Sequence, residues 1–231
     1  MILISYALNA QERKKTWDYP VKPGMEEWQH FKSIDEMYKA CQIPENILKT
    51  LDTESLAQIC MDYPAPLVLI IYNSPQAGFS SFHSNFNGIR ELFRRKDIGK
   101  YLLKKYTNMS FADFNPLWPI EKQGDFSFKY QFVETIIAQP QVIQSLDATD
   151  RKLLLKEVIK KFDMKNSRTD LFGGNSLVIN AWIMARILHS ENKFSTKYTN
   201  KSEIEMSLES GQLVDYDIQC IFQQAKKYTN E

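Results

Sequence analysis

The longest apolar stretch of the chain runs from Ser176 to Ser190, with the sequence SLVINAWIMARILHS. Its apolar residues point in almost every direction around a helix of 3.6 residues per turn, so other elements must cover it. Asn180, Arg186 and His189 make the stretch too polar and too short to span a bilayer, which takes about 20 mostly apolar residues. We therefore expect it to be the central helix of a core, with Asn175 and Ser176 as N-cap candidates.

The first part of the chain combines an extended arm with short helices. Residues 11–24 contain WDYPVKPG, whose two prolines exclude a helix and predict an arm that lays its aromatic side chains over the body. Ser33 to Glu36 forms a capping box that opens a helix ending near Cys41. Pro44 begins the next helix at its first position, and Asp52 or Thr53 caps another.

Two further runs precede the middle of the chain. Pro66 to Tyr72, PLVLIIY, suits a buried strand or a helix by composition. We predict a helix, because no second strand of similar quality exists to pair with it. Phenylalanine and isoleucine then recur every three or four residues from Phe79 to Phe93, which predicts an amphipathic helix, and another turn or two follows to Tyr106.

Residues 109–124 hold two prolines without periodicity and predict a connector between two helical parts, residues 11–108 and 125–231. The second part shows helical patterns that we place at Phe126 to Ala138, Asp147 to Phe162, the central helix, Ile204 to Ser210 and Asp215 to Lys227. The predicted fold class is all-α: an irregular multi-helix bundle or a short helical-hairpin array, with an extended N-terminal arm.

Residues 1–10, MILISYALNA, form an apolar start that ends in small residues and passes abruptly to a charged stretch. This pattern is typical of the end of a secretory signal, although no basic segment precedes it, and the alternative is a short element packed on the domain. We expect export to the periplasm or the exterior, with cleavage after Ala10 and a mature chain that begins near Gln11.

Composition adds few constraints. The 29 basic and 28 acidic residues give a net charge of +1, so the whole molecule has no general attraction to nucleic acid or anionic lipid. Cys41, Cys60 and Cys220 show no zinc-binding spacing, and we expect no metal and no cofactor. Cys41 and Cys60 would form a disulfide in an oxidising compartment or remain buried thiols, and both alternatives stay open.

Three stretches carry a resemblance: YPVKPGMEEW at Tyr19 to Trp28, KACQIP at Lys39 to Pro44, and NFNGIRELFRRKD at Asn85 to Asp97. Together they resemble a set of exported all-helical proteins of gut Bacteroidetes for which no activity is known. The likeness covers about residues 17–106. It implies export and a helical fold, and it assigns no catalytic residue, cofactor or partner.

Motifs for catalysis are largely missing from the sequence. It contains no HExxH, GxSxG, P-loop or GxGxxG pattern, and Gly173-Gly174 before the central helix is a weak candidate for an anion site. The weak candidate polar site is Ser80 with His83, which would make a nucleophile and a base if a third group oriented the ring. Their i, i+3 spacing on a helix equally fits two surface side chains.

Two helical regions are rich in lysine and arginine. The residues that we select as a candidate basic surface are Arg90, Arg94, Arg95, Lys152, Lys156 and Lys160. If both faces met on one surface, they would form a groove for phosphates or acidic glycans; if not, they are two solvated faces.

These observations favour an exported helical protein that binds a protein or glycan partner without chemistry of its own. Nucleic acid is not a favoured partner, because export would remove most of it. The alternative is a helical hydrolase with a carboxylate or Ser/His site. The discriminating feature is a deep pocket that gathers His83 or two carboxylates.

Overall fold

A computed structural model describes residues 17–69, 71–194 and 201–230. The predicted signal segment, residues 1–10, lies outside the described residues. Within them the secondary structure is entirely helical, with no strand, which confirms the predicted all-α multi-helix fold.

The elements are α1 (Glu26–Gln29), α2 (Ile34–Ala40), α3 (Glu45–Leu48), α4 (Thr53–Met61), the 3-10 helix η1 (Pro66–Leu69), α5 (Pro75–Asn85), α6 (Asn87–Leu92), α7 (Ile98–Asn108), the 3-10 helix η2 (Phe111–Asp113), α8 (Ile120–Ile137), α9 (Pro140–Gln144), α10 (Ala148–Asn166), α11 (Thr169–Phe172), α12 (Asn175–Ser190), α13 (Lys201–Ser210) and α14 (Asp215–Asn230).

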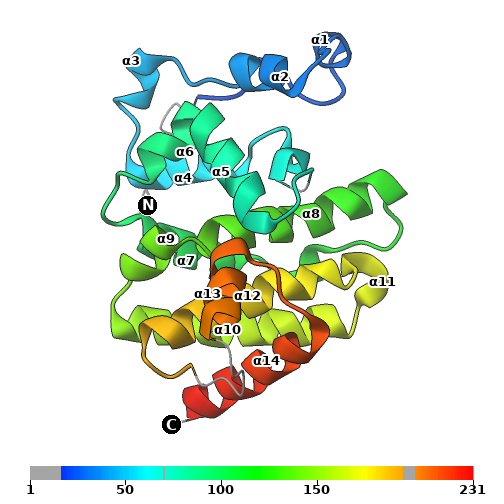
Figure 1. The fold of residues 1–231 in the computed structure, drawn as a ribbon. Coiled ribbons are helices and arrows are strands. Elements are labelled where there is room, and N and C mark those ends of the chain that lie inside the picture. The colour runs from blue at the N-terminus through cyan, green and yellow to red at the C-terminus, as the bar shows by residue number, and fades with distance from the viewer. Residues whose placement is uncertain (1–16, 70, 195–200, 231) are drawn as a thin grey trace, which may run out of the picture.

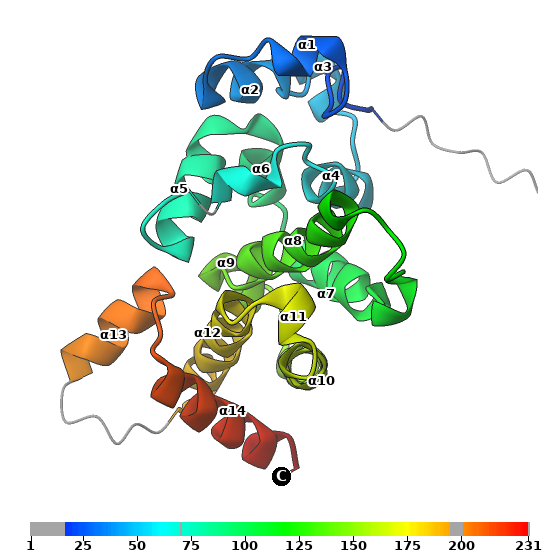
Figure 2. The same ribbon diagram turned by 90° about the vertical axis from the view of Figure 1, so that its right-hand side faces the viewer.

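The helices are stacked roughly in chain order along one axis of the molecule (Figure 1). The short helices α1 to α3 lie at one end, α4 to α6 come next, α7 to α9 occupy the middle, and α10, α12 and α14 form the other end. In the orthogonal view, α8 lies between the α4 to α6 layer and the α10 to α12 layer (Figure 2). One cluster of buried apolar residues runs through these layers, so the two predicted halves share a continuous core.

The central helix occurs where the apolar pattern predicts it. α12 packs against α8, α9, α10, α13 and α14, and Trp182 and the six residues after it, except Arg186, are fully buried. Its start differs from the prediction in one respect: Gly174 precedes the helix, and the hydroxyl of Ser176 donates to the Gly173 carbonyl (2.9 Å) instead of capping a backbone N–H.

The described part of the arm also follows the prediction, whereas residues 11–16 lie outside the described residues. Residues 17–24 are not helical, and Tyr19 is buried against the rings of Tyr63 and Phe86. Its hydroxyl donates to the Ile59 carbonyl in α4 (2.8 Å). The ring contacts and this hydrogen bond together hold the arm against the body. The predicted caps are present too, since Ser33 accepts from the Glu36 N–H and Asp52 accepts from the Ser55 N–H.

Several boundaries differ from the sequence prediction, and three of these differences change how the chain is divided into helices. Among the described residues of the run from Pro66 to Tyr72, only the 3-10 turn η1 is helical. The apolar stripe from Phe79 to Phe93 is divided into α5 and α6, because Phe86 adopts an extended conformation (φ −116°, ψ 119°) and its ring enters the core. α8 begins at Ile120, inside the predicted connector. Pro119 is its N-cap residue, and a proline at this place sacrifices no helical hydrogen bond and has a restricted φ, which favours the start of a helix directly after it.

No helix among the described residues has the length and apolar character to cross a membrane.

Candidate functional site

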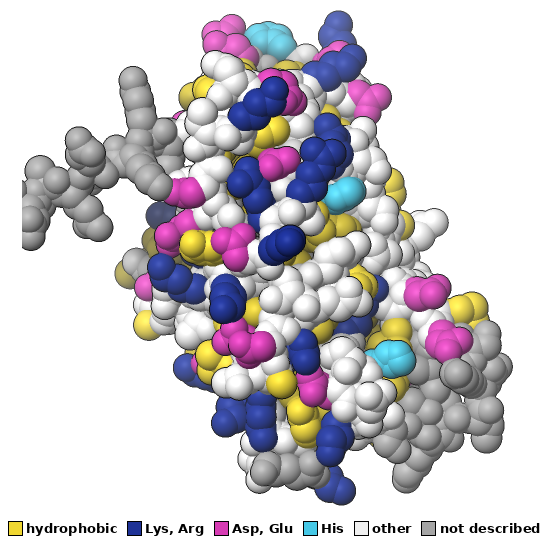
Figure 3. All heavy atoms as spheres, turned by 90° about the vertical axis from the view of Figure 1, so that its left-hand side faces the viewer, with side chains coloured by type: hydrophobic (Ala, Val, Ile, Leu, Met, Phe, Trp, Pro, Cys, Tyr) yellow, Lys and Arg dark blue, Asp and Glu magenta, His cyan; other side chains and the backbone are white. Residues whose placement is uncertain are grey.

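The basic residues selected from the sequence lie in separate layers. Arg90 lies in α6, which packs against α4 and α5, and Arg94 and Arg95 lie in the segment between α6 and α7. Lys152, Lys156 and Lys160 lie in α10, which packs against α7, α11, α12 and α14. On the face shown in Figure 3, lysine and arginine side chains alternate with aspartate and glutamate and do not gather in one patch.

Local partners further reduce the charge of Arg90, Arg94 and Arg95. Glu91 lies 2.7 Å from Arg95 and 3.5 Å from Arg94, and Arg90 donates to the Ser84 carbonyl (2.7 Å). On α10, the ammonium group of Lys152 lies over the Tyr228 ring, while Lys156 and Lys160 are exposed. The positive charge therefore does not form a single groove on the face that Figure 3 shows.

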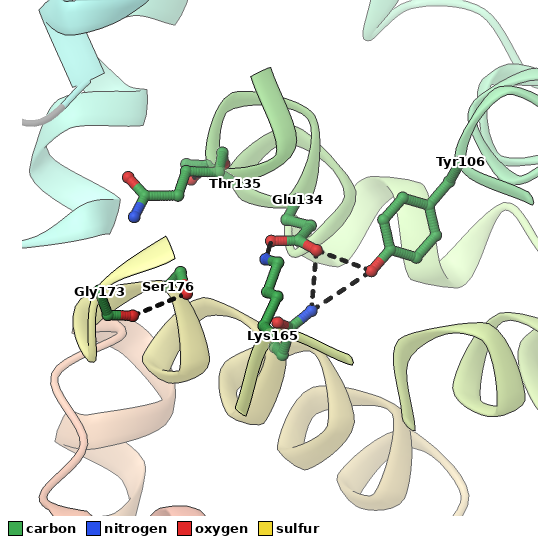
Figure 4. Close-up of polar contacts among 8 residues, drawn as sticks. Tyr106, Glu134, Thr135, Lys165, Gly173 and Ser176 are labelled. Atoms are coloured by element: carbon green, nitrogen blue, oxygen red, sulfur yellow. Dashed lines mark hydrogen bonds and ion pairs between the residues drawn. The ribbon is translucent and has the colours of Figure 1, made fainter. Parts of the chain in front are cut away.

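Two further lysines of α10, Lys161 and Lys165, are buried in the core. Their charge alone would predict a solvated position. Lys165 is fully buried and forms an ion pair with Glu134 of α8, which is also fully buried. The other carboxylate oxygen of Glu134 accepts from the Tyr106 hydroxyl (2.8 Å) and from the Asn180 side-chain amide (2.9 Å). Figure 4 shows Tyr106, Glu134 and Lys165 converging from α7, α8 and α10, and Asn180 belongs to α12.

Burial and charge oppose each other in this buried polar cluster of Tyr106, Glu134, Lys165 and Asn180. Desolvation lowers the pKa of Lys165, and the nearby Glu134 carboxylate counteracts part of that shift. Desolvation, assisted by the Glu134 charge, raises the pKa of Tyr106 well above its usual value. Because all four residues are fully buried, substrate has no direct access to them, and their polar contacts join four helices inside the core.

A signal for the buried lysines exists in the sequence. Leu154, Val158, Lys161 and Lys165 follow one another at spacings of four, three and four residues, so they share one face of α10. Lys161 is almost fully buried as well, with its ammonium group 4.4 Å from the centre of the Tyr106 ring. The position of Lys161 and Lys165 on the apolar stripe of α10 predicts that they are buried, whereas their charge alone predicts that they are exposed.

The candidate pair of Ser80 and His83 is not assembled as a catalytic site. Ser80 is exposed and accepts from the Gln76 side chain (3.3 Å), whereas the His83 ring packs against Phe79 and Phe93. Burial, assisted by Arg90, lowers the pKa of His83. Among the described residues no hydrogen bond joins Ser80 to His83, and neither residue lines the cavity described below.

The segment between α7 and α8 forms an aromatic cluster that sequence reasoning treated as a plain connector. Its rings are in continuous contact: Trp118 and Phe114 touch Phe126, and Phe126 touches Tyr130 of the same helix. Phe111 extends the cluster to Tyr130 and to Phe172 of α11. In Figures 1 and 2 this segment and the start of α8 lie at the periphery of the molecule.

Two apolar side chains on this segment point away from the body. Leu117 is 88% exposed and Ile120 is 73% exposed, the highest values among the large apolar residues of the described part. We call Phe114, Leu117, Trp118 and Ile120 the apolar tip. Hydrogen bonds fix its backbone, since the Leu117 N–H donates to the Asn115 side chain (2.9 Å) and the Gln123 amide donates to the Trp118 carbonyl (2.8 Å).

A cavity of about 770 Å³ lies on another side of α8. It is lined by η1 and the residues after it, by α8, by the junction of α11 and α12, and by the turn between α13 and α14. None of its lining residues is charged. It therefore gathers neither His83 nor a pair of carboxylates, which were the features expected of a hydrolase.

The cysteines and potential metal ligands form no further centre. Cys41, Cys60 and Cys220 are free thiols, and the first two are fully buried. Burial raises the pKa of Cys41 to about 11, which keeps its thiol protonated near neutral pH. In the described part of the chain, no group of three or more His, Cys, Asp or Glu residues could hold a metal ion.

No protein-family model, curated protein or solved structure matches this chain.

Proposed function

We propose that this protein acts by binding another protein through its apolar tip, without chemistry of its own. The observation that carries the proposal is the exposure of Leu117 and Ile120 on a segment whose backbone is held in place. Single exposed apolar residues are common on protein surfaces. Leu117 and Ile120, however, lie beside the half-buried rings of Phe114 and Trp118, and aromatic and aliphatic residues grouped in this way often dominate the binding energy of interfaces.

The rigidity of the tip supports a binding role. Pro116 and Pro119 flank the Leu117-Trp118 pair, and the rings of Phe114 and Trp118 are anchored against Phe126. A surface that is already ordered loses little conformational entropy when it binds. Complete burial of Leu117 and Ile120 in a partner would contribute about 1.5 to 3 kcal/mol each before the other costs of association.

The charges around the tip indicate what kind of partner fits. The exposed charged residues nearest in sequence are Asp113, Glu121, Lys122 and Asp125, and Lys122 already lies over the Trp118 ring at 4.4 Å. Arg168, which is distant in sequence, lies over the Phe114 ring at 5.3 Å and forms an ion pair with Asp170. The three carboxylates favour a partner surface with an apolar recess bordered by basic residues. The same charges disfavour anionic lipid, acidic glycan and nucleic acid.

We also propose that the protein is exported, with cleavage after Ala10. The apolar composition of residues 1–10 and the resemblance over residues 17–106 support this proposal. Mass spectrometry of protein purified from its source tests it: a mature chain that begins near Gln11 agrees with export, whereas an intact Met1 in cytoplasmic protein contradicts it.

Co-purification from the source organism tests the binding proposal. A tagged chain and its Leu117→Asp variant are compared with a Leu153→Asp variant, because Leu153 is another exposed leucine, 44% exposed, on α10. We expect Leu153→Asp to retain the same co-purified protein and Leu117→Asp to lose most of it. Equal retention by the two variants would contradict a role for the tip.

A further inference from the structure

The cavity beside α8 is built from segments that are far apart in the sequence. Aromatic rings form much of its wall, contributed by Tyr72, by Phe128 and Phe132 of α8, and by Phe172 of α11. Val178 and Leu213 add aliphatic surface. At about 770 Å³ the space falls within the roughly 300 to 1,000 Å³ range of small-molecule sites.

Two glycines with positive φ lie in the lining of this cavity. Gly173 has a positive φ of 65° at the junction of α11 and α12, a conformation that L-residues rarely adopt. Gly211 has a φ of 75° and packs so closely on Trp182 that an added Cβ would lie 2.9 Å from the ring. The turn that contains Gly211 is tied across the cavity, because the Gln212 side chain donates to the Asn73 carbonyl (2.7 Å).

The polar groups of the lining are neutral, and some have no partner within the described residues. The side-chain amides of Asn73 and Gln131 make no hydrogen bond in the described part of the chain. Thr135 already donates to the Gln131 carbonyl (2.8 Å). The cavity therefore offers one or two amide groups for a neutral hydrogen bond and no group of opposite charge for an ionised ligand.

We propose that this cavity binds an uncharged small molecule with an aromatic or branched aliphatic body and a carbonyl or hydroxyl group. The aromatic and aliphatic walls match the body, and the free amides of Asn73 and Gln131 match the polar group. The lining holds no charged side chain that would compensate an ionised ligand for its lost hydration, so we expect the cavity to prefer uncharged molecules. This site is distinct from the apolar tip, and the proposal does not depend on the protein-binding function.

Two fluorescent probes with the same aromatic body test the charge selectivity. N-phenyl-1-naphthylamine is neutral, whereas 1-anilinonaphthalene-8-sulfonate carries a sulfonate, and each is titrated into the full chain at neutral pH. We expect saturable binding of the neutral probe at one site per chain, with the sulfonated probe at least tenfold weaker. Absence of saturable binding, or equal binding of both probes, would overturn the proposal.

Gly174 provides the matched variants for locating the probe. It lines the cavity in a helical conformation, and a Cβ built on it meets no heavy atom within 4 Å, so larger side chains fit without a backbone clash. Gly174→Ala should bind the neutral probe like the unmodified chain, and Gly174→Trp should bind it at least tenfold more weakly because the indole occupies the space. Unchanged binding by a folded Gly174→Trp would refute the assignment of the site.

A second filling variant, Val178→Phe, serves if Gly174→Trp does not fold. Val178 is half-buried on α12 and contributes to the cavity wall, so a phenyl ring there also reduces the space. The same tenfold loss of neutral-probe binding is expected, with the circular dichroism spectrum and melting temperature as the check on folding. Full binding by this variant would place the probe outside the cavity.

Discussion

Lys165 and Glu134 form an ion pair at a place where neither side chain has any contact with solvent. The pair joins α10 to α8, and the hydrogen bonds that Glu134 accepts from Tyr106 and Asn180 extend it to α7 and α12. The cost of removing two charges from water is offset only while both are present and hydrogen-bonded.

Removal of one partner of this pair should therefore destabilise the protein strongly. We expect Glu134→Leu and Lys165→Met, made separately, each to lower the free energy of unfolding by about 3 to 5 kcal/mol, because each leaves a buried charge without its counter-charge. The double variant should recover much of that loss. Urea titrations of the three variants measure this, and a double variant as unstable as the sum of the single ones would contradict the coupling.

Trp182 and Trp118 provide a comparison between the core and the tip. Trp182 is fully buried, and its indole N–H donates to the Leu208 carbonyl (2.7 Å), whereas Trp118 is half-buried on the loop. Trp182→Ala should lower the free energy of unfolding by about 3 to 5 kcal/mol, and Trp118→Ala should lower it less. Denaturant titrations of both variants measure the two losses in the free energy of unfolding. A smaller loss for Trp182→Ala than for Trp118→Ala would contradict the assignment of Trp182 to the centre of the core.

Gly78 is required where α5 crosses η1. A Cβ at this position would lie 1.9 Å from the Leu69 carbonyl oxygen, which belongs to the backbone and cannot rotate away. Gly78→Ala should therefore destabilise the protein by about 1 to 3 kcal/mol or more. Gly124→Ala is the control, since Gly124 lies in α8 with open space around it and should gain about 0.5 to 1 kcal/mol. Thermal melts of both variants should shift in opposite directions.

Stability should decline in alkaline solution. Burial raises the pKa of Tyr19, Tyr63, Tyr106 and Tyr130, so above about pH 10 the folded chain keeps protons that the unfolded chain releases. The free energy of unfolding then falls by up to about 1.4 kcal/mol per pH unit for each tyrosine. The lowered pKa values of Lys161 and Lys165 act in the opposite direction, but only below about pH 10.5.

Tyr130→Phe isolates one part of this alkaline effect. The Tyr130 hydroxyl is buried without a hydrogen-bond partner in the described structure, so its removal breaks no hydrogen bond. The variant should lose stability less steeply than the parent as the pH rises from about 10 to 11. Urea titrations at these two pH values measure the difference, and an identical slope would contradict the contribution assigned to Tyr130.

The elements that sequence predicts best are those set by local pattern. The central helix and the caps at Ser33 and Asp52 follow from periodicity and local hydrogen bonding, and the structure confirms them. The break at Phe86 depends instead on tertiary packing, since the core receives its ring only from an extended backbone. Helical propensity and apolar spacing contain no information about such a contact.

The candidate sites were harder to predict for a physical reason. The cavity forms where η1, α8, α12 and the turn at Gly211 meet, so no local pattern marks it. The proline-flanked connector follows from the sequence, but the exposure of Leu117 and Ile120 depends on tertiary packing, in which the rings of Phe114 and Trp118 pack against Phe126. Charge alone would place Lys161 and Lys165 on the surface, whereas their register on α10 indicates burial.

Site-specific photo-cross-linking tests the central claim of a protein-binding tip most directly. A photoreactive phenylalanine analogue is placed at Leu117, at Ile120 or at the control position Leu153, and living source cells are irradiated. We expect one discrete protein adduct, the same for Leu117 and Ile120, and none at Leu153. No adduct at either tip position, or the same adduct at all three positions, would contradict the claim.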